Sequence, residues 1–528
     1  MCGICGAVEC GDLQIVKKMT AYIAHRGPDN DGFYSDKQIA LGHRRLKIID
    51  LSEKGKQPMC NEDGSVWITF NGEIYNYKQL RDELSKKHSF KSQSDTEVLV
   101  HAYEEYGLDF VSKLRGDFAI ALWDSNARRL ILARDPLGIK PLYYARVDGG
   151  LVFASEVKAL LAYPGFPRKL NYQALDEFTS FRYSLGPHTL FQGIYKLQPG
   201  NIGVYENSRL RTTPYYSLNF TEENESEQYW ISKIRELLFE SVKMRLMSDV
   251  PLGVFLSGGL DSSFITALAS KASPKPVQTF SVDFGSPTDE TDYARQVAEY
   301  CNTDHHELTV NASDSSILPV VTWHLDEPAA DVASVPTYLL AQKTKKFVTV
   351  VLTGDGGDEV FGGYAHYTRL PLVHKTKAIA SKASALAAIA GLVYPRDAAY
   401  RLGQALKNSC DETKLFLEYA SAFSSKEKQE LYAPEVESTA LASQSAEART
   451  KEFFTTHATS FENKLYAFDL MHLLPDDNLM KVDKMTMAHG VESRVPYLDS
   501  VAVSKFVKMP SRFKANPWAR KILFRKAM

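Results

Sequence analysis

The sequence predicts an α+β first half of stacked sheets with helices, and an α/β second half with a parallel sheet and a mostly helical end. Three observations lead to this prediction. The chain has 528 residues, more than the roughly 100–250 that one hydrophobic core usually serves. Short apolar runs separated by turns dominate the first half, whereas strands and helices alternate in the second. A polar, acidic stretch at residues 219–227 lies between them and is typical of a linker.

The composition is that of an ordinary globular protein. Apolar residues make up 44% and charged residues 24%, and the 62 basic and 64 acidic side chains give a formal net charge of -2. No basic surface for a phosphate backbone is indicated, so we expect no nucleic-acid partner. Residues 1–11 lack the basic and apolar regions of a signal peptide, which favours the cytoplasm. Residues 378–394 are apolar but are interrupted by Lys382, so we expect a packed helix and no membrane partner.

Two patterns that could suggest a metal are better explained otherwise. Cys2 and Cys5 form a C-x-x-C, but no second pair follows at zinc spacing, and six cysteines are too few for a disulfide scaffold. His305 and His306 are adjacent, and neighbours on a strand point to opposite faces, so both rings cannot easily reach one ion. A structural or substrate-pocket role is favoured for this pair.

The element pattern supports the two-part prediction. In the first half we expect strands at residues 67–70, 118–123, 130–133 and 151–154, and a helix at 96–106. A helix then presents one apolar face, made of Trp230, Ile234, Leu237, Leu238, Val242 and Leu246. After it we expect strands at 251–256, 278–284 and 347–352, helices at 262–271 and 293–301, and mainly helix beyond Tyr364. Ligands of such parallel sheets bind at the carboxyl ends of the strands.

One of these strand ends carries a glycine-rich turn. The run from Val254 to Ser263 leads from a strand through Gly258 and Gly259 into a helix. Glycines let backbone N–H groups approach an anion closely, and the helix N-terminus adds unpaired donors. The run matches neither G-x-x-x-x-G-K-[ST] nor G-x-G-x-x-G.

The sequence Ser-Gly-Gly-Leu-Asp-Ser-Ser at residues 257–263 resembles the pyrophosphate loop of N-type ATP pyrophosphatases, which split ATP to AMP and pyrophosphate. Residues 281–284 resemble the strand end that receives adenine, and residues 352–364 also match. The resemblance implies an ATP site formed by Leu256, Ser257, Gly258, Gly259, Asp261, Ser262, Val282, Thr353 and Gly354. It also implies that Asp261 helps to bind Mg²⁺.

An acidic loop follows the third predicted strand of the second half, with Asp355, Asp358 and Glu359 on a glycine-rich background. Carboxylates do not bind an anionic substrate, so they should hold Mg²⁺, an amine or a proton during ammonia attack. We predict Asp358 as a second metal ligand and Asp355 as an acid or base. Residues 481–499 resemble the asparagine synthetase family, whose catalytic lysine maps to Lys484, where a cation can steady charge on the phosphates.

Cys2 places a thiol directly after the initiator Met1, with a side chain small enough to permit removal of that methionine. The exposed α-amine, with a reference pKa of ~8, can then act as the base for the thiol of the same residue. The nucleophile therefore requires no histidine.

Four further motifs follow Cys2 in order, at residues 25–29, 43–46, 71–76 and 94–97. The set resembles class II glutamine amidotransferases, which have an N-terminal-nucleophile fold. The resemblance implies that the Asn71 amide and the Gly72 N–H form the oxyanion hole. It also implies that Arg45 clamps the α-carboxylate of glutamine, that Asp95 pairs with its α-ammonium, and that Glu73 lies beside the substrate.

The two resemblances together cover essentially the whole chain and match glutamine-hydrolysing asparagine synthetases. They imply an amidotransferase domain at residues 2–210, a synthetase domain at 228–528, and the use of glutamine, ATP, Mg²⁺ and a carboxylate, most simply aspartate. Ammonia from Cys2 would travel between the domains to an acyl-adenylate. The sequence leaves open whether the protein forms a homodimer.

Two departures leave the acceptor open. Asparagine synthetases commonly carry Glu where this chain has Asp355, and a shift of about 1 Å at a reacting centre can change a rate ~100-fold. The shorter side chain resembles amidotransferases of surface-polysaccharide pathways, so a sugar uronate is the alternative acceptor. Family members generally continue beyond the point that matches Met528, which leaves open whether the sequence is a fragment. A stand-alone glutaminase and a non-enzymatic regulator are further alternatives, against which the intact loop at residues 257–263 argues.

Overall fold

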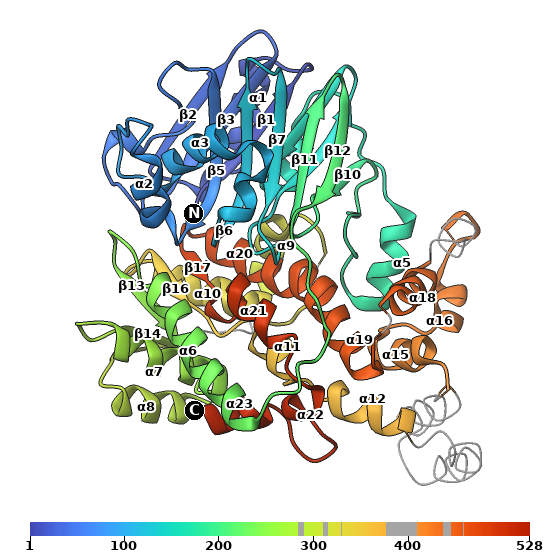
Figure 1. Cartoon of the computed structure of the whole chain (residues 1–528). Helices are drawn as coiled ribbons and strands as arrows, with labels where there is room; N and C mark the ends of the chain where they lie inside the picture. The colour runs from blue at the N-terminus through green and yellow to red at the C-terminus, as the bar shows by residue number, and fades with distance from the viewer. Residues whose placement is uncertain are drawn as a thin grey trace.

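The structure is a computed structural model that describes residues 1–283, 290–309, 315–328, 330–375, 408, 410–436, 445–457 and 459–528. Figure 1 shows two layered halves stacked on one another, with the N-terminus close to the boundary between them. The helix expected at residues 378–394 lies outside the described residues.

The first half contains two antiparallel six-stranded sheets, with strand orders β10-β8-β9-β1-β3-β2 and β12-β11-β7-β6-β5-β4. The first sheet consists of β1 (Gly3–Val8), β2 (Asn30–Ser35), β3 (Ile39–Arg45), β8 (Tyr143–Val147), β9 (Gly150–Ala154) and β10 (Ile194–Lys196). The second consists of β4 (Met59–Cys60), β5 (Val66–Ile74), β6 (Gly116–Asp124), β7 (Arg129–Arg134), β11 (Asn201–Glu206) and β12 (Arg209–Pro214).

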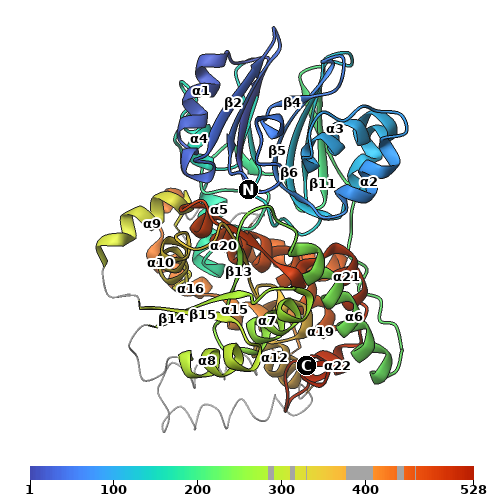
Figure 2. The ribbon, with the colours of Figure 1, turned by 90° about the vertical axis from the view of Figure 1, so that its left-hand side faces the viewer.

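The two sheets face each other and helices cover their outer faces. Ile4, Leu41, Ala121, Leu132 and Phe153 form part of the buried core between the sheets. Figure 2 shows α1 and α4 on one side of this sandwich and α2 and α3 on the other. The helices of this half are α1 (Leu13–Ala21), α2 (Tyr77–Leu84), α3 (Asp95–Tyr106), α4 (Val157–Leu160) and α5 (Tyr172–Phe181), with short turns η1 (Ala24–Arg26), η2 (Glu53–Gly55) and η3 (Gly107–Lys113). The predicted stacked-sheet fold is confirmed.

The second half is built on a parallel five-stranded sheet with the order β15-β14-β13-β16-β17. Val351 faces the core that includes Phe280, whereas Leu352 faces the core of Ile265, so this sheet is buried on both faces. The strands are β13 (Leu252–Phe255), β14 (Gln278–Asp283), β15 (Asp304–Thr309), β16 (Val350–Leu352) and β17 (Glu492–Arg494). Strands β15 and β17 were not expected from the sequence, and β16 begins three residues later than expected.

Helices fill the rest of the second half, as expected. Ser226 caps the N-terminus of α6 (Glu227–Arg245), directly after the predicted linker. The other helices before Tyr364 are α7 (Leu260–Ala272), α8 (Thr291–Tyr300), α9 (Leu318–Leu325), α10 (Ser334–Thr344) and α11 (Gly357–Phe361), with the turn η4 (Ser315–Ile317). Beyond it follow α12 (His366–Lys375), α15 (Glu412–Ala420), α16 (Ser425–Leu431), α18 (Ala446–Thr456), α19 (Phe461–Phe468), the π-helical η5 (Asp469–Asn478), α20 (Leu479–Met487), η6 (Pro496–Leu498), α21 (Ser500–Phe506), α22 (Ser511–Lys514) and α23 (Ile522–Ala527).

The halves are joined by buried polar contacts as well as by the chain. The Arg26 guanidinium contacts Glu156 of its own half at 2.9 Å and Asp483 of the other half at 2.8 Å. Helix α5 packs against α15 and α18 of the second half, as Figure 1 shows. None of the described helices is long and apolar enough to cross a membrane.

Candidate active sites

The first cavity lies where β1, β3, β5 and the start of α3 meet, and it measures about 30 Å³. Its lining includes Cys2, Arg45, Gly72, Glu73 and Asp95. Asn71 adjoins them, because its Oδ1 accepts a hydrogen bond of 2.8 Å from the backbone N–H of Cys2. The structure thus brings together all six residues that the sequence assigned to glutamine chemistry.

Met1 occupies one side of this cavity. Its α-ammonium lies 2.6 Å from Glu492 on β17, and both groups are buried. With Met1 in place the nitrogen of Cys2 is a peptide amide, which cannot act as a base. Burial raises the pKa of the Cys2 thiol, while the nearby ammonium and Arg45 act in the opposite direction. Removal of Met1 would therefore enlarge the cavity and create the base at the same step.

Asn71 offers an unpaired donor beside Cys2, and Gly72 follows it on β5. Within the described part of the chain the buried Asn71 Nδ2 has no hydrogen-bond partner, although its Oδ1 is fixed by Cys2. A free buried donor beside the nucleophile is what a developing oxyanion requires. Gly72 follows at φ +154, and a Cβ there would lie 2.1 Å from the backbone oxygen of Asp117. Only glycine allows β5 to pass so close to β6 here.

Charged groups of both signs line the same cavity. Arg45 donates to the carbonyl of Ser52 at 2.8 Å and to that of Asp50 at 2.5 Å, which fixes its guanidinium. Burial raises the pKa of Asp95 to about 6, although the N–H of Ile74 donates to its carboxylate. Burial, and then the charge of Asp95, raise the pKa of Glu73. This pair of carboxylates opposite a guanidinium can receive a zwitterionic amino acid.

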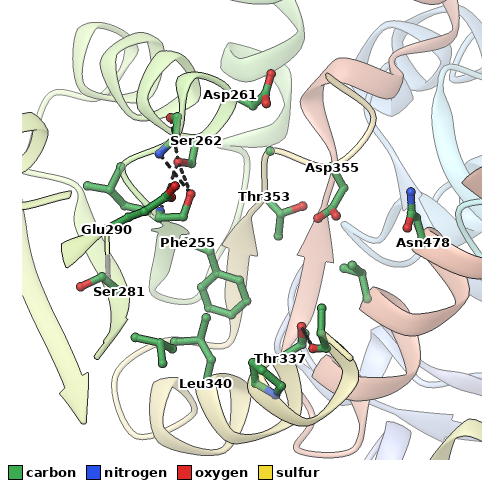
Figure 3. Close-up of a pocket in the computed structure, with 18 of the residues that line it drawn as sticks. Phe255, Asp261, Ser262, Ser281, Glu290, Thr337, Leu340, Thr353, Asp355 and Asn478 are labelled. Atoms are coloured by element: carbon green, nitrogen blue, oxygen red, sulfur yellow. Dashed lines mark hydrogen bonds between the residues drawn. The ribbon is translucent and has the colours of Figure 1, made fainter. Parts of the chain in front are cut away.

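The second cavity, of about 660 Å³, opens at the carboxyl ends of β13, β14 and β16. Figure 3 shows Ser262, Thr353 and Asp355 beside these strand ends and Thr337 and Leu340 of α10 across the space. Ten of the predicted residues line it, namely Leu256, Ser257, Gly259, Asp261, Ser262, Val282, Thr353, Gly354, Asp355 and Asp358. Gly258 is not in this lining; its φ is +84, and a Cβ there would lie 2.7 Å from the backbone nitrogen of Ala294.

The loop between β13 and α7 offers donors to an anion. Gly259 is the N-cap of α7 and provides no side-chain cap, so first-turn N–H groups stay available. The Ser257 and Ser262 hydroxyls lie 3.1 Å apart and brace the turn. The apolar side of the cavity, with Phe255, Val282 and Leu340, is suited to a flat ring.

An acidic pair faces this loop and shares one lysine. The ammonium of Lys521 contacts Asp261 and lies 2.7 Å from Asp358. Burial raises the pKa of Asp261, while Lys521 acts in the opposite direction. Oδ1 of Asp261 has no hydrogen-bond partner among the described residues. Two adjacent carboxylates with a free oxygen fit a Mg²⁺ ion that also binds phosphate.

Lys484 lies in the interface between the halves, beside Leu325 and Asp326. Its Nζ is fully buried and donates to the carbonyl of Leu325 at 2.7 Å and to Asp326 at 2.8 Å. Lys484 is not among the described residues that line the second cavity. The motif match placed a lysine in the correct region of the chain, but the helical turn of α20 points it into the interface with Asp326.

Sequence reasoning missed two lysines of this region: Lys481, which lines the second cavity, and Lys521, which is outside the described lining but contacts Asp261 and Asp358 of it. Lys521 lies 260 residues from Asp261, and no motif signals its position. Lys481 lines the cavity and lies 2.5 Å from Asp331. Burial lowers the pKa of Lys481, but Asp355 and Asp331 outweigh this effect and leave it raised.

Glu359 is a buried acid in the lining of this cavity, and its pKa is raised. Its carboxylate accepts hydrogen bonds of 2.7 Å from the Tyr364 hydroxyl and from the Asn478 amide of the π-helical segment η5. Burial raises its pKa to about 7, although the bond from Tyr364 acts the other way. A carboxyl group with this pKa can exchange a proton at neutral pH.

Comparisons with known proteins agree with this two-site arrangement. A family described as a glutamine amidotransferase domain matches residues 1–216, and one described as asparagine synthase matches residues 233–528. Glutamine-hydrolysing asparagine synthetase 1 of Bacillus subtilis is 37% identical, over all of this chain and 84% of its own length. Asparagine synthetase 3 of that organism is 34% identical, over 69% of this chain and 63% of its own length. The amidase chry2 of Gibberella zeae is 36% identical, over 65% of this chain and 54% of its own length.

Proposed function

Because the chain belongs to the family of glutamine-hydrolysing asparagine synthetases, we propose that it makes asparagine from aspartate, glutamine and ATP. The family is one of ATP-dependent, glutamine-dependent amidation. The choice of aspartate is our inference. It is supported by the similarity to B. subtilis asparagine synthetase 1, which spans the whole chain.

In the first half, Cys2 acts on glutamine after Met1 has been removed. The α-amine of Cys2 takes the thiol proton, and the thiolate attacks the side-chain carbonyl carbon of glutamine. Asn71 Nδ2 and the Gly72 N–H stabilise the resulting oxyanion. The protonated amine returns its proton as the C–N bond breaks, so ammonia leaves and a thioester remains. Water then hydrolyses the thioester to glutamate and restores the thiol.

In the second half, the carboxylate acceptor attacks the α-phosphorus of ATP, forming an acyl-adenylate and releasing pyrophosphate. The loop at residues 257–262 binds the β- and γ-phosphates through its N–H groups. Asp261 and Asp358 would hold Mg²⁺, which when bound neutralises charge on the phosphates. We assign to Lys521 the phosphate-neutralising role that the family resemblance implied for Lys484. Its contacts with both carboxylates support this assignment.

Amide formation releases a proton that an enzyme group must accept. Ammonia attacks the acyl carbon, loses one proton and expels AMP. Glu359, with a pKa of about 7, is suited to this step, and Asp355 lines the same cavity beside Lys481. Ammonium is not nucleophilic, so the route from Cys2 must exclude water and proton donors. The buried contacts of Arg26 with Glu156 and Asp483 lie on the boundary that the ammonia has to cross.

The observation that carries this proposal is that one chain holds a complete Cys2 pocket and a complete pyrophosphate loop. A uronate acceptor is the alternative, favoured by the shorter side chain of Asp355. AMP release should be measured with glutamine, ATP and either aspartate or glucuronate. Aspartate-dependent AMP release is expected, and release driven by glucuronate alone would favour the alternative. If aspartate is the acceptor, Asp355→Glu should preserve activity. If a uronate is the acceptor, the longer side chain of Asp355→Glu should lower activity.

A further inference from the structure

A group of metal-ligating side chains lies in the first half, away from both cavities. Glu62, His88, His101 and Glu104 each direct one nitrogen or oxygen atom into the same small volume, and these atoms lie within 4.8 Å of one another. Glu62 precedes β5, His88 follows α2, and the other two belong to α3. His101 and Glu104 are three residues apart on the helix, so their side chains share one face.

The spacing of these atoms is that of a coordination shell. Ligands at 2.0–2.1 Å from a tetrahedral Zn²⁺ ion are about 3.3 Å apart. His88 Nδ1 lies 3.6 Å from Glu62 Oε1 and 3.6 Å from Glu104 Oε2. His101 Nδ1 lies 3.7 Å from Glu62 Oε2 and 2.8 Å from Glu104 Oε2. Three of the four distances are too long for hydrogen bonds but suit atoms that share one ion.

Neighbouring groups orient these side chains through hydrogen bonds. Nε2 of His88 lies 3.2 Å from Glu105, and its proton there leaves Nδ1 free as a metal ligand. Glu104 Oε1 accepts a bond of 2.7 Å from Asn61, which leaves Oε2 directed at the two histidines. The backbone N–H of Ser89 donates to Glu62 at 2.9 Å. This carboxylate–histidine pairing is typical of metal centres.

Charge and burial favour an ion over a plain ion-pair cluster. The rings of His88 and His101 are stacked with centroids 4.5 Å apart, so the two side chains lie side by side. His101 is almost fully buried, with Phe90 against its other face at 4.7 Å. The two carboxylates of the group supply negative charge for a divalent ion. Nitrogen and oxygen ligands together favour Zn²⁺ over Mg²⁺.

We propose that Glu62, His88, His101 and Glu104 form a structural site for a divalent transition metal, with Zn²⁺ as the preferred ion. The site would tie the turn before β5 and the end of α2 to α3. His101 lies six residues after Asp95, about 9 Å along the helix axis. The metal would therefore hold in place the helix whose first residue lines the glutamine pocket.

The test is Zn²⁺ binding by the full chain after chelator treatment, measured by calorimetry and by metal analysis with excess Mg²⁺ present. His88→Asn and Glu62→Gln remove partly exposed ligands, and His188→Asn is a matched control outside the cluster. We expect one Zn²⁺ per chain in the wild type and the control, and at least 10-fold weaker binding in both ligand variants. Zn²⁺ should also raise the Tm of the first two proteins but not of the variants.

Binding of Zn²⁺ to the ligand variants as tight as to the wild type would overturn the proposal, as would the absence of a wild-type site. Substitution of Co²⁺ gives a second readout that does not depend on stability. A four-coordinate site should produce strong visible absorption in the wild type that is lost in His88→Asn. If the wild type shows only the weak absorption of hydrated Co²⁺, the assignment fails.

Discussion

The guanidinium of Arg494 lies 3.0 Å from the carboxylate of Glu73, so the glutamine pocket is ion-paired to strand β17 of the ATP-site sheet. Arg494 also contacts Glu492 at 2.6 Å, and Glu492 binds the ammonium of Met1. Arg494 and Glu73 are almost entirely buried. Because Glu492 and Arg494 both belong to β17, the nucleophile's end of the chain and Glu73 each contact the parallel sheet of the second half directly.

Arg494→Gln should weaken the use of glutamine. Without the guanidinium, burial raises the pKa of Glu73 further, and the neutral carboxyl no longer attracts the α-ammonium of glutamine. We expect kcat/KM for glutamine to fall about 10- to 100-fold, corresponding to about 1.4–2.8 kcal/mol. Steady-state glutaminase assays measure this loss. Arg115→Gln is the control, because it breaks another ion pair between the halves, with Asp499, away from the pocket. Equal losses in both variants would refute a specific role for Arg494.

Asp95 should make glutamine binding depend on pH. Its pKa of about 6 lies above the ordinary 3.8, so the carboxylate becomes protonated as the pH falls through 6. KM for glutamine should therefore rise below pH 6, while KM for ammonia in the synthetase reaction lacks this inflection. The same raised pKa means that the protonated form stabilises the fold fully below pH 3.8, and that this contribution is lost as the pH rises through 6. A glutamine KM that stays constant from pH 7 to pH 5 would contradict the assignment.

Substitution of Lys521 should lower ATP–pyrophosphate exchange, whereas substitution of Lys484 should lower the Tm. Lys521→Met should lower ATP–pyrophosphate exchange at least 100-fold with little change in Tm, because the lysine faces Asp261 and Asp358 at the cavity. Lys484→Met removes one of two cations beside the buried Asp326, the other being Lys158 at 2.9 Å, and should lower the Tm. Exchange kinetics and thermal melts of both variants decide the matter. If the Lys521→Met enzyme is folded and its ATP–pyrophosphate exchange is normal, another cation must neutralise the phosphates.

Glu359 should act after the acyl-adenylate has formed. Glu359→Gln removes a base of pKa about 7, so amide formation should fall about 100-fold or more. ATP–pyrophosphate exchange, which needs no ammonia, should survive. In the wild type the amidation rate should rise with pH through 7, because only the ionised carboxylate can accept the proton. Glu290→Gln is the control, since Glu290 lines the same cavity. If exchange and amide formation fall together, Glu359 serves adenylation instead.

What could be predicted from the sequence were the parts of the sites that adjoin one another in the chain. The oxyanion-hole pair Asn71 and Gly72, and the run from Ser257 to Ser262, owe their geometry to one strand or one turn, so a local motif defines them. The two fold classes followed from strand and helix alternation in the same way. The roles assigned to these residues remain predictions.

The missed features depend on tertiary contacts. Lys521 reaches Asp261 only because α23 folds back over α7, and the link from Glu73 to Arg494 crosses 421 residues. Strand β17 has three residues, too few to give a periodic signal. The Glu62, His88, His101 and Glu104 group joins three elements that no spacing rule connects.

The most direct test of the two-site account follows nitrogen from one cavity to the other. The full chain should be incubated with aspartate, Mg²⁺-ATP and glutamine labelled with ¹⁵N in its side-chain amide, beside a Cys2→Ala variant. The account predicts ¹⁵N-asparagine with one AMP per asparagine from the wild type, and none from Cys2→Ala unless ammonia is added. Label-free product, ADP as the stoichiometric nucleotide, or glutamine hydrolysis without any asparagine would contradict it.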